Sequence, residues 1–366
     1  ILAPKNPNNF PDKKWEFQGI IRIYNNFSIG CLYYMDKIKV LLNKTYAIQP
    51  IELITPVDVK NSKFISNDNH WLVTTKAGTY FFKKYHQSHV KKVSNEMRAV
   101  VILGNAILIP KVLHTRRGGY YTKDNNNIYV MYEYIQAKNL KDSKVSKRIY
   151  FSVLCKTQNQ LLNYGCNNRY YNFKNHIKRC ELATKQIIQY ILLSTSNRAV
   201  QDLTYVTFLI DELKNIKKEF QVLKIKSSLV HGDMLMQNIL EHPQNTFWII
   251  DWEKSRNYIT IIDVLRCIIL TMVDSKKEDL GLKKSVFLRD VTFCLKNIMF
   301  NKAELKHAMN LFYFHLVTNT DFLERMYIDG QDLIHNRTRE DFIICTWVKK
   351  NKNELQLGIN NNFPIA

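Results

Sequence analysis

The sequence lacks the cysteine spacings that a zinc site or a disulfide framework needs. Its 366 residues include seven cysteines, an odd number, and no two of them form a Cys-x-x-Cys pair. Structural zinc sites and disulfide scaffolds depend on close, repeated spacings, so the pattern argues against both. Cys155 and Cys267 lie in apolar runs, where a cysteine packs as a small core residue. This usage favours a reducing, cytosolic location.

Long apolar runs are also missing. The best candidate, residues 259–273, is interrupted by Asp263 and Arg266, whereas a helix that crosses a bilayer needs about 20 mainly apolar residues. The N-terminal residues show no basic stretch followed by an apolar core, so no secretory signal is predicted. The sequence therefore predicts no membrane partner.

Acidic residues are scarce relative to basic ones. The chain has 32 Asp and Glu against 53 Lys and Arg, a formal net charge of +21. Such a surplus attracts anions, including nucleotides, nucleic acids and acidic lipids. The basic residues are spread along the chain, which is typical of a solvated surface, and no nucleic-acid recognition motif accompanies them. Nucleic-acid binding is kept only as a third hypothesis.

Residues 1–134 are predicted to form a β-rich lobe. Prolines among Asn and Lys mark the first thirty residues as an irregular extension, and apolar residues at helical spacing predict a helix at 32–42. Short β-rich runs separated by turn residues then predict an antiparallel sheet with one inserted helix at 90–103. The expected strands are 51–57, 71–75, 79–85 and 128–134.

Residues 135–366 are predicted to form a larger, mainly helical lobe. Between residues 209 and 223 the apolar positions alternate four and three apart, which places one stripe toward a core. Together the two parts predict an α+β fold of two lobes. The last 92 residues, 275–366, contain no recognisable motif. The other expected helices are 143–164, 172–196, 261–273, 286–299 and 302–319.

One passage, residues 229–255, interrupts the helical lobe with two short β-like runs around a turn at 242–245. A hairpin returns its second strand to the start of the first, so Asn238 and Asp251 should lie side by side. Asp233 lies in the loop before the hairpin. Two carboxylates and an amide suit phosphoryl transfer, because oxygen ligands hold magnesium on the phosphates while a free carboxylate orients the attacking hydroxyl.

This passage resembles the catalytic core of the aminoglycoside phosphotransferase and choline kinase-like family, which has the protein-kinase-like fold. The family pattern is His-Gly-Asp, four residues, Asn, a hairpin, and Ile-Asp-Trp/Phe-Glu, and it stands here at 231–233, Asn238 and 250–253. The resemblance implies that Asp233 is the catalytic base and that Asn238 and Asp251 bind Mg²⁺. It also implies ATP as the phosphate donor.

The β-rich lobe carries further features of this resemblance. The family's nucleotide-phosphate lysine corresponds to Lys83 in the run GTYFFKKY, and Glu96, as the only acid of the 90–103 helix, is its expected partner. An exposed lysine pair on an edge strand is the alternative. The run IYVMYEYI resembles the last strand and the hinge, where backbone groups near Glu133 and Ile135 would meet the adenine.

One departure concerns the phosphate loop, since no Gly-x-Gly-x-x-Gly pattern occurs at residues 60–70. Family members often use a turn with Ser and Asn instead, which makes Ser66 and Asn67 candidate phosphate contacts, with an ordinary hairpin turn as the alternative. Asp263 matches the acid that anchors the family's catalytic loop, and a helix-capping aspartate is the alternative there. The resemblance covers roughly residues 35–270.

The leading functional hypothesis is an ATP- and Mg²⁺-dependent phosphotransferase that acts on a hydroxyl of a small molecule, such as a sugar, an amino alcohol or an aminoglycoside. The alternative is a non-catalytic nucleotide-binding or spore-coat protein, because the layout also resembles the spore-coat-associated branch, with a cytoplasmic or spore-associated location. Neither hypothesis specifies an oligomeric state. A polycationic acceptor would need acidic residues, and one sequence cluster offers them: Asp321, Glu324, Asp329, Asp332, Glu340 and Asp341.

Overall fold

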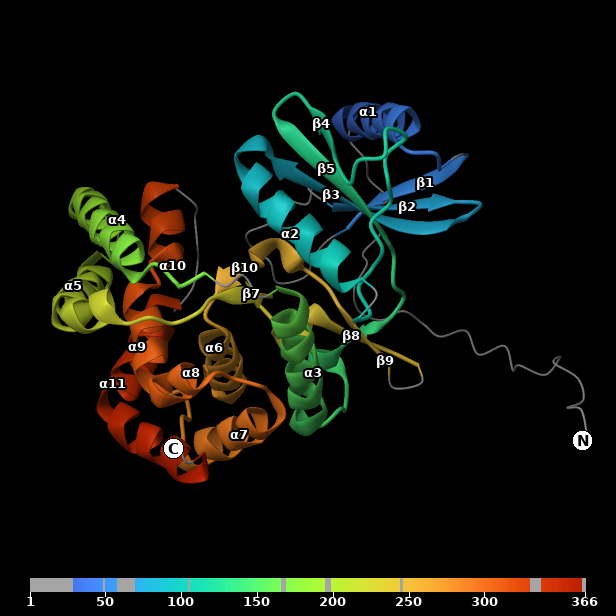
Figure 1. The fold of residues 1–366 in the computed structure, drawn as a ribbon. Coiled ribbons are helices and arrows are strands. Elements are labelled where there is room, and N and C mark those ends of the chain that lie inside the picture. The colour runs from blue at the N-terminus through green and yellow to red at the C-terminus, as the bar shows by residue number, and fades with distance from the viewer. Residues whose placement is uncertain are drawn as a thin grey trace, which may run out of the picture.

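The computed structural model describes residues 29–363, except 49, 58–69, 105, 166–168, 195–198, 244–245 and 330–336. The described residues form a smaller β-rich lobe and a larger, mainly helical lobe (Figure 1). The predicted α+β architecture is thereby confirmed. Among these residues, no helix combines the length and the apolar character needed to cross a lipid bilayer.

The smaller lobe is built on one antiparallel sheet of five strands, in the order β1-β2-β3-β5-β4. The predicted sheet with one inserted helix is confirmed, and β4 is an additional short strand that the sequence did not indicate. The strands are β1 (Ile51–Pro56), β2 (His70–Thr75), β3 (Gly78–His86), β4 (Thr122–Asp124) and β5 (Asn127–Glu133), and the inserted helix is α2 (Val90–Leu103).

Helix α1 (Ile29–Thr45) covers one face of this sheet (Figure 1). The buried side chain of Leu42 packs with those of Trp71 and Phe82, which lie on the face of β2 and β3 that α1 covers. Burying these side chains together removes apolar surface from water, the main driving force of folding. The helix begins and ends slightly outside the predicted range of 32–42.

Helix α2 contacts both lobes. Val93 and Met97 pack with side chains of β3 and β5 on the face of the sheet opposite α1. Ala99, Val100 and Leu103, one turn further along, belong to the core of the larger lobe. The helix therefore has two apolar contact regions, one toward each lobe.

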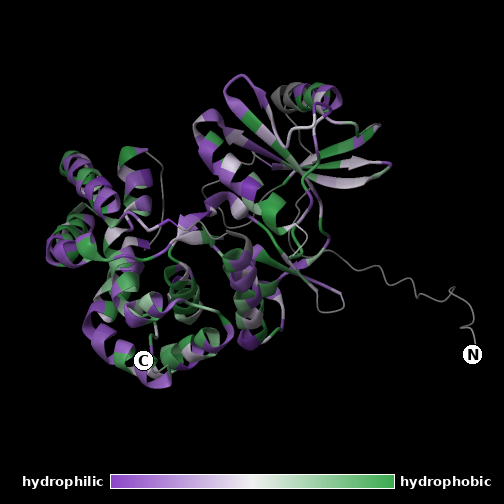
Figure 2. Ribbon diagram, in the orientation of Figure 1, coloured by the Kyte–Doolittle hydropathy of each residue, from purple (hydrophilic) through white to green (hydrophobic). Residues whose placement is uncertain are grey.

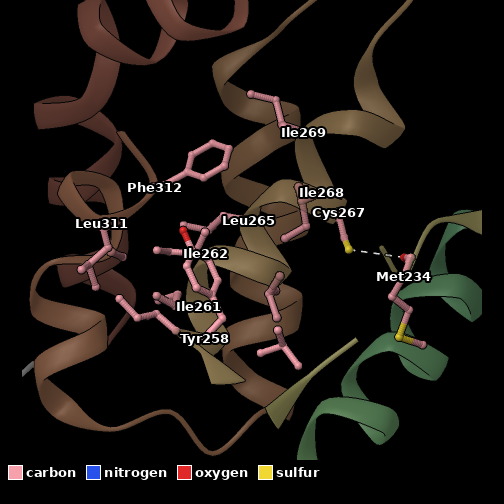
Figure 3. Packing of buried hydrophobic residues seen from close by; sticks show 14 of the residues in the cluster. Met234, Tyr258, Ile261, Ile262, Leu265, Cys267, Ile268, Ile269, Leu311 and Phe312 are labelled. Atoms are coloured by element: carbon pink, nitrogen blue, oxygen red, sulfur yellow. Dashed lines mark hydrogen bonds between the residues drawn. The ribbon is translucent and has the colours of Figure 1, made fainter. Parts of the chain in front are cut away.

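The larger lobe packs around α6, whose residues are buried on nearly every side. Ile262 and Leu265 of α6 pack near Leu311 and Phe312 of α9 (Figure 3). In Figure 2, α6 is coloured mainly green, the colour of hydrophobic residues. The helices are α3 (Lys147–Gly165), α4 (Phe173–Leu193), α5 (Ala199–Val222), α6 (Thr260–Met272), α7 (Lys284–Asn297), α8 (Lys302–Lys306), α9 (Ala308–Thr318), α10 (Asp321–Leu323), the π-helix η6 (Glu324–Ile328) and α11 (Arg337–Asn362).

The structure differs from the predicted helices in two places. The single helix expected at 302–319 is divided into α8 and α9 at His307, whose backbone leaves the helical region. In α8, Asn301 and Glu304 form a capping box, and the Glu304 carboxylate also accepts a hydrogen bond from the Ile261 amide at the start of α6 (3.2 Å). The helix α11, 26 residues long, was not predicted at all.

The packing of α1 on the sheet predicts that Leu42→Ala lowers the stability of the protein. Leu42 is fully buried, so the substitution leaves a cavity and should reduce the free energy of unfolding by about 2–5 kcal/mol. The urea midpoint measures this loss. The matched control is Val40→Ala in the same helix, where the side chain is 66% exposed; an equal loss in both variants would contradict the packing.

Candidate active site

A short hairpin brings two of the predicted site residues together. Strand β8 (Ile239–His242) pairs with β9 (Thr246–Ile249), and β8 also pairs with β6 (Lys138–Asn139). The pairing continues one step further, where the Ile250 amide donates to the Asn238 carbonyl at 3.0 Å. Asn238 and Asp251 consequently lie at the same end of the hairpin, as the sequence pattern predicts.

The loop before the hairpin is fixed by His231. Its Nδ1 accepts a hydrogen bond from the Asp233 amide at 3.2 Å, so Nε2 carries the proton and donates to the Ile250 carbonyl at 3.0 Å. The ring also packs on Trp252, with 4.4 Å between centroids. Burial lowers the pKa of His231, which keeps the imidazole neutral. This histidine ties the loop to the end of β9.

Gly232 lies in a very tight backbone contact. Its φ of +79° is in the left-handed region, and a Cβ at this position would lie 2.3 Å from the Lys254 carbonyl oxygen. No side chain fits there. The glycine of the His-Gly-Asp motif is thus required by the close approach of loop 231–238 to the turn after β9.

The Asp233 carboxylate is held by two cations. Arg266 of α6 donates to Oδ1 at 2.9 Å and to the Gly232 carbonyl at 3.0 Å, while Lys254 donates to Oδ2 at 2.7 Å. Burial alone would raise the pKa of Asp233, but the charges of Arg266 and Lys254 outweigh it and hold the pKa well below its ordinary value. The carboxylate is therefore ionised and fixed in orientation. Neither cation was identified in the sequence.

Asn238 and Asp251 provide oxygen atoms that suit a magnesium ion. The Asn238 amide nitrogen donates to the Asp233 carbonyl at 2.8 Å, which leaves its Oδ1 as an acceptor. Asp251 adopts a left-handed backbone (φ 62°), a conformation that aspartate tolerates and that is common at functional sites. In the described part of the chain, no cluster of three or more His, Cys, Asp or Glu side chains could hold a metal. A magnesium ion bound with a nucleotide needs only one or two protein ligands, because phosphates and water complete its coordination.

Lys83 reaches this site from the other lobe. Its Nζ lies 3.1 Å from Asp251 Oδ1 and 3.1 Å from Glu253 Oε2. Burial alone would lower the pKa of Lys83, but the carboxylates of Asp251, Glu253 and Glu96 hold it well above its ordinary value. Lys84 points to the opposite face of β3, over the Trp71 ring.

The expected pairing of Lys83 with Glu96 is not what the structure contains. Both residues belong to the described part of the chain and no ion pair joins them; Lys83 pairs with Asp251 and Glu253 instead. Glu96 is buried and accepts hydrogen bonds from the hydroxyls of Tyr85 (2.5 Å) and Tyr132 (2.7 Å). Burial raises the pKa of Glu96, against the opposing charge of Lys83. The tyrosines were missed because their faces depend on strand register.

Asp263 lies beneath the loop. Its Oδ2 accepts a hydrogen bond from Gln158 Nε2 at 2.8 Å and a long one from the Gly232 amide at 3.5 Å. Arg266 lies three residues later on α6, and residues at that spacing share one face of a helix. Since Asp263 was expected to anchor the loop, this spacing is the sequence signal by which Arg266 could have been found.

Two of the remaining predicted nucleotide residues, Glu133 and Ile135, lie at and just after the end of β5. The Glu133 amide already donates to the Lys111 carbonyl at 2.8 Å, so of its backbone groups only the carbonyl can meet an adenine. Ile135 lies two residues after the end of β5 and is partly buried. Ser66 and Asn67 lie outside the described residues.

Three of the five described acids in the cluster proposed for a polycationic acceptor pair with arginines. Arg337 lies 3.0 Å from Asp341 and 3.7 Å from Glu340, and Arg179 lies 3.6 Å from Glu324. Asp321 and Asp329 are exposed, and Asp332 lies outside the described residues. Arginines therefore neutralise part of the cluster within the described chain.

The Gly232 contact predicts that Gly232→Ala is far more harmful than a glycine substitution in open space. Gly118 is the matched control, because its φ is also +79° and nothing lies within 4 Å of an added Cβ. Gly118→Ala should cost about 1–2 kcal/mol of stability from the left-handed backbone alone. Gly232→Ala adds a backbone clash and should cost several kcal/mol more by urea unfolding; equal losses would contradict this contact.

The ion pairs of Asp233 predict a pH-dependent stability. Because its pKa in the folded state lies below the unfolded value, the pairs stabilise the protein above about pH 4 and lose their contribution as the pH falls further. We expect Asp233→Asn to be less stable by about 2 kcal/mol near neutral pH, below the value for a fully buried pair because Lys254 is half exposed. Urea unfolding at several pH values should show that the difference in unfolding free energy between the unaltered protein and Asp233→Asn becomes smaller as the pH falls. A difference that stays constant would contradict the ion pairs.

Comparison with solved structures identifies the fold. A spectinomycin phosphotransferase in complex with ADP and spectinomycin matches with a TM-score of 0.54 and 15% identity, over 89% of this chain and 98% of that chain. An amicoumacin kinase in complex with AMP-PNP and Ca²⁺ matches with a TM-score of 0.52 and 13% identity, over 93% and 98%. The choline kinase of Streptococcus pneumoniae matches with a TM-score of 0.51 and 11% identity, over 87% and 99%.

Sequence comparison adds nothing to this likeness, since no protein-family model and no curated protein matches the chain. At identities of 11–15% the likeness establishes the fold alone. The resemblance predicted from the motif is confirmed at that level, while membership of the spore-coat-associated branch stays a prediction. The chain has the two-lobed protein-kinase-like fold that aminoglycoside phosphotransferases and a choline kinase share.

Proposed function

We propose that this protein is an ATP- and Mg²⁺-dependent phosphotransferase that moves the γ-phosphate of ATP to a hydroxyl group of a small molecule. The observation that supports it most directly is the meeting of Lys83, from the smaller lobe, with Asp251 of the hairpin at 3.1 Å. Asp251 shares that end of the hairpin with Asn238, whose amide bonds to the backbone of Asp233. Phosphoryl transfer depends mainly on such positioning of charged groups.

Asp233 would orient the acceptor hydroxyl. Each of its oxygens already accepts one hydrogen bond, and a carboxylate oxygen can accept a second. Its strongly lowered pKa makes it a weak base, so it would hold the hydroxyl in line and receive the proton late. That timing suits phosphoryl transfer, whose transition state is loose and forms little bond to the acceptor early.

Lys83, Asn238 and Asp251 would hold the nucleotide phosphates. When ATP binds, the Lys83 ammonium would exchange its carboxylate partners for oxygens of the α- and β-phosphates, which frees Asp251 for the metal. Mg²⁺ on Asn238 and Asp251 would neutralise charge on the phosphates. Glu96, with its two tyrosine partners, would act on Lys83 through its charge. The structures of similar fold that contain ADP or AMP-PNP support a nucleotide as the donor.

Residues 1–134 would supply the nucleotide-binding lobe, with adenine contacts at the Glu133 carbonyl and the Ile135 backbone, and with Ser66 and Asn67 as phosphate contacts. Residues 135–366 would supply the catalytic loop and the acceptor site. Since three of the clustered acids pair with arginines, a neutral polyol or an amino alcohol with one charge fits better than an aminoglycoside polycation. A neutral acceptor needs no acidic surface.

A coupled ADP-release assay over sugars, amino alcohols and aminoglycosides tests the proposal. With an accepted substrate, Asp233→Asn should lower kcat by about 10²–10⁴-fold, because the hydroxyl loses its charged partner. Lys83→Met should lower kcat/KM for ATP, and the matched control Lys84→Met, on the other face of β3, should not.

Two outcomes would contradict the proposal. Full turnover in Asp233→Asn would remove the assigned role of the carboxylate. A thermal shift with ATP and Mg²⁺ but no turnover on any acceptor of the panel would favour the alternative of a non-catalytic nucleotide-binding protein.

A further inference from the structure

A buried histidine at the start of β2 has an unused ring nitrogen. His70 is only 6% exposed, and its Nδ1 is buried with no hydrogen-bond partner among the residues that the structure describes. A buried polar atom without a partner is costly, so it is rare in folded proteins and calls for an explanation. A ligand that is absent from the structure is one such explanation.

The position of His70 indicates where such a ligand would lie. In the β2–β3 register, His70 is directly opposite Lys83, and paired residues of antiparallel strands share a face of the sheet. Its ring stacks on Phe81, two residues before Lys83, with 5.4 Å between centroids. The next residue, Trp71, points to the other face and packs against α1. His70 thus lies on the face of the sheet that meets the larger lobe.

The charges around His70 keep its ring neutral. Burial, and then the nearby Lys83 ammonium, lower the pKa of His70 to about 3, with Glu253 acting in the opposite direction. A neutral imidazole carries one N–H, which can donate a single hydrogen bond. Beside a lysine that would bind phosphates, the fitting acceptor is a phosphate oxygen.

We propose that His70 is a ligand of the nucleotide phosphates, which donates a hydrogen bond from Nδ1 to an oxygen next to those that Lys83 contacts. The proposal rests on the proposed nucleotide site and adds a residue to it. It also accounts for the missing Gly-x-Gly-x-x-Gly pattern at 60–70. Where glycines do not bring backbone amides close to the phosphates, a side-chain donor at the start of β2 would supply a hydrogen bond instead.

Isothermal titration of the full chain with ADP and with adenosine tests this role. His70→Leu removes the donor and should weaken ADP binding about 10- to 100-fold, the range for a hydrogen bond to a charged group. Adenosine has no phosphate, so its affinity should not change. His70→Asn places an amide N–H near the position of Nδ1 and should recover most of the lost affinity, whereas His70→Gln places it near Nε2 and should not.

The matched control is His114→Asn, because His114 is exposed and lies in the loop before β4, where it bonds only to Gly118 within the described chain. Thermal unfolding of each variant checks that the fold is retained. Unchanged ADP binding in His70→Leu, an equal loss for adenosine, or recovery by Gln instead of Asn would each overturn the proposal. If the unaltered protein binds no ADP, the proposed function itself is contradicted, and this inference with it.

Discussion

The close backbone contact between Gly232 and Lys254 constrains every other part of the site. With 2.3 Å from the position of a Cβ to the Lys254 carbonyl, the loop 231–238 and the turn after β9 can pack only if residue 232 has no side chain. This contact sets Lys254 beside Asp233, while the β8–β9 hairpin sets Asp251 near Asn238. The hydrogen bonds of His231 to both segments then preserve the arrangement. Polar groups from two stretches of sequence are thus held on one rigid unit before any ligand arrives, which is the preorganisation that charge stabilisation requires.

Several charged side chains of the site are buried and need partners of opposite charge or hydrogen-bond donors. Carboxylates that are wholly or partly removed from water need partners. Here Asp233 has two cations, the partly exposed Asp251 and Glu253 share Lys83, and the buried Glu96 has two tyrosine hydroxyls. Lys83 therefore neutralises the acids that follow the hairpin, as a bound cation would. Under the proposed function, a nucleotide that takes Lys83 away would have to bring its own positive charge to replace it. Nucleotide and metal ion are coupled in this scheme through one lysine.

The sequence predicts those parts of the site that lie close together along the chain. The hairpin, its loop and the convergence of Asn238 and Asp251 follow from spacing and turn residues alone. Contacts between distant segments do not follow from local spacing. The tyrosine partners of Glu96 depend on the register of β3 against β5. Arg266 becomes a partner of Asp233 only when α6 packs under the loop 231–238.

The same limit applies to the fold. The strands are short β-rich runs between turn residues, and α2 has apolar residues at helical spacing. In α11 the buried apolar face is harder to recognise, because Asn351 interrupts it between Val348 and Leu355 and the helix is rich in Asn and Lys. Helix α2 has a consequence of another kind. It is anchored to the sheet through Val93 and Met97 and to the larger lobe through Ala99 and Leu103. Any motion that parts the lobes must expose one of these apolar contacts to water, which opposes the motion. Under the proposed function, the rate of ADP release would then depend on the apolar packing of α2 against both lobes, at a distance from the phosphate-binding residues.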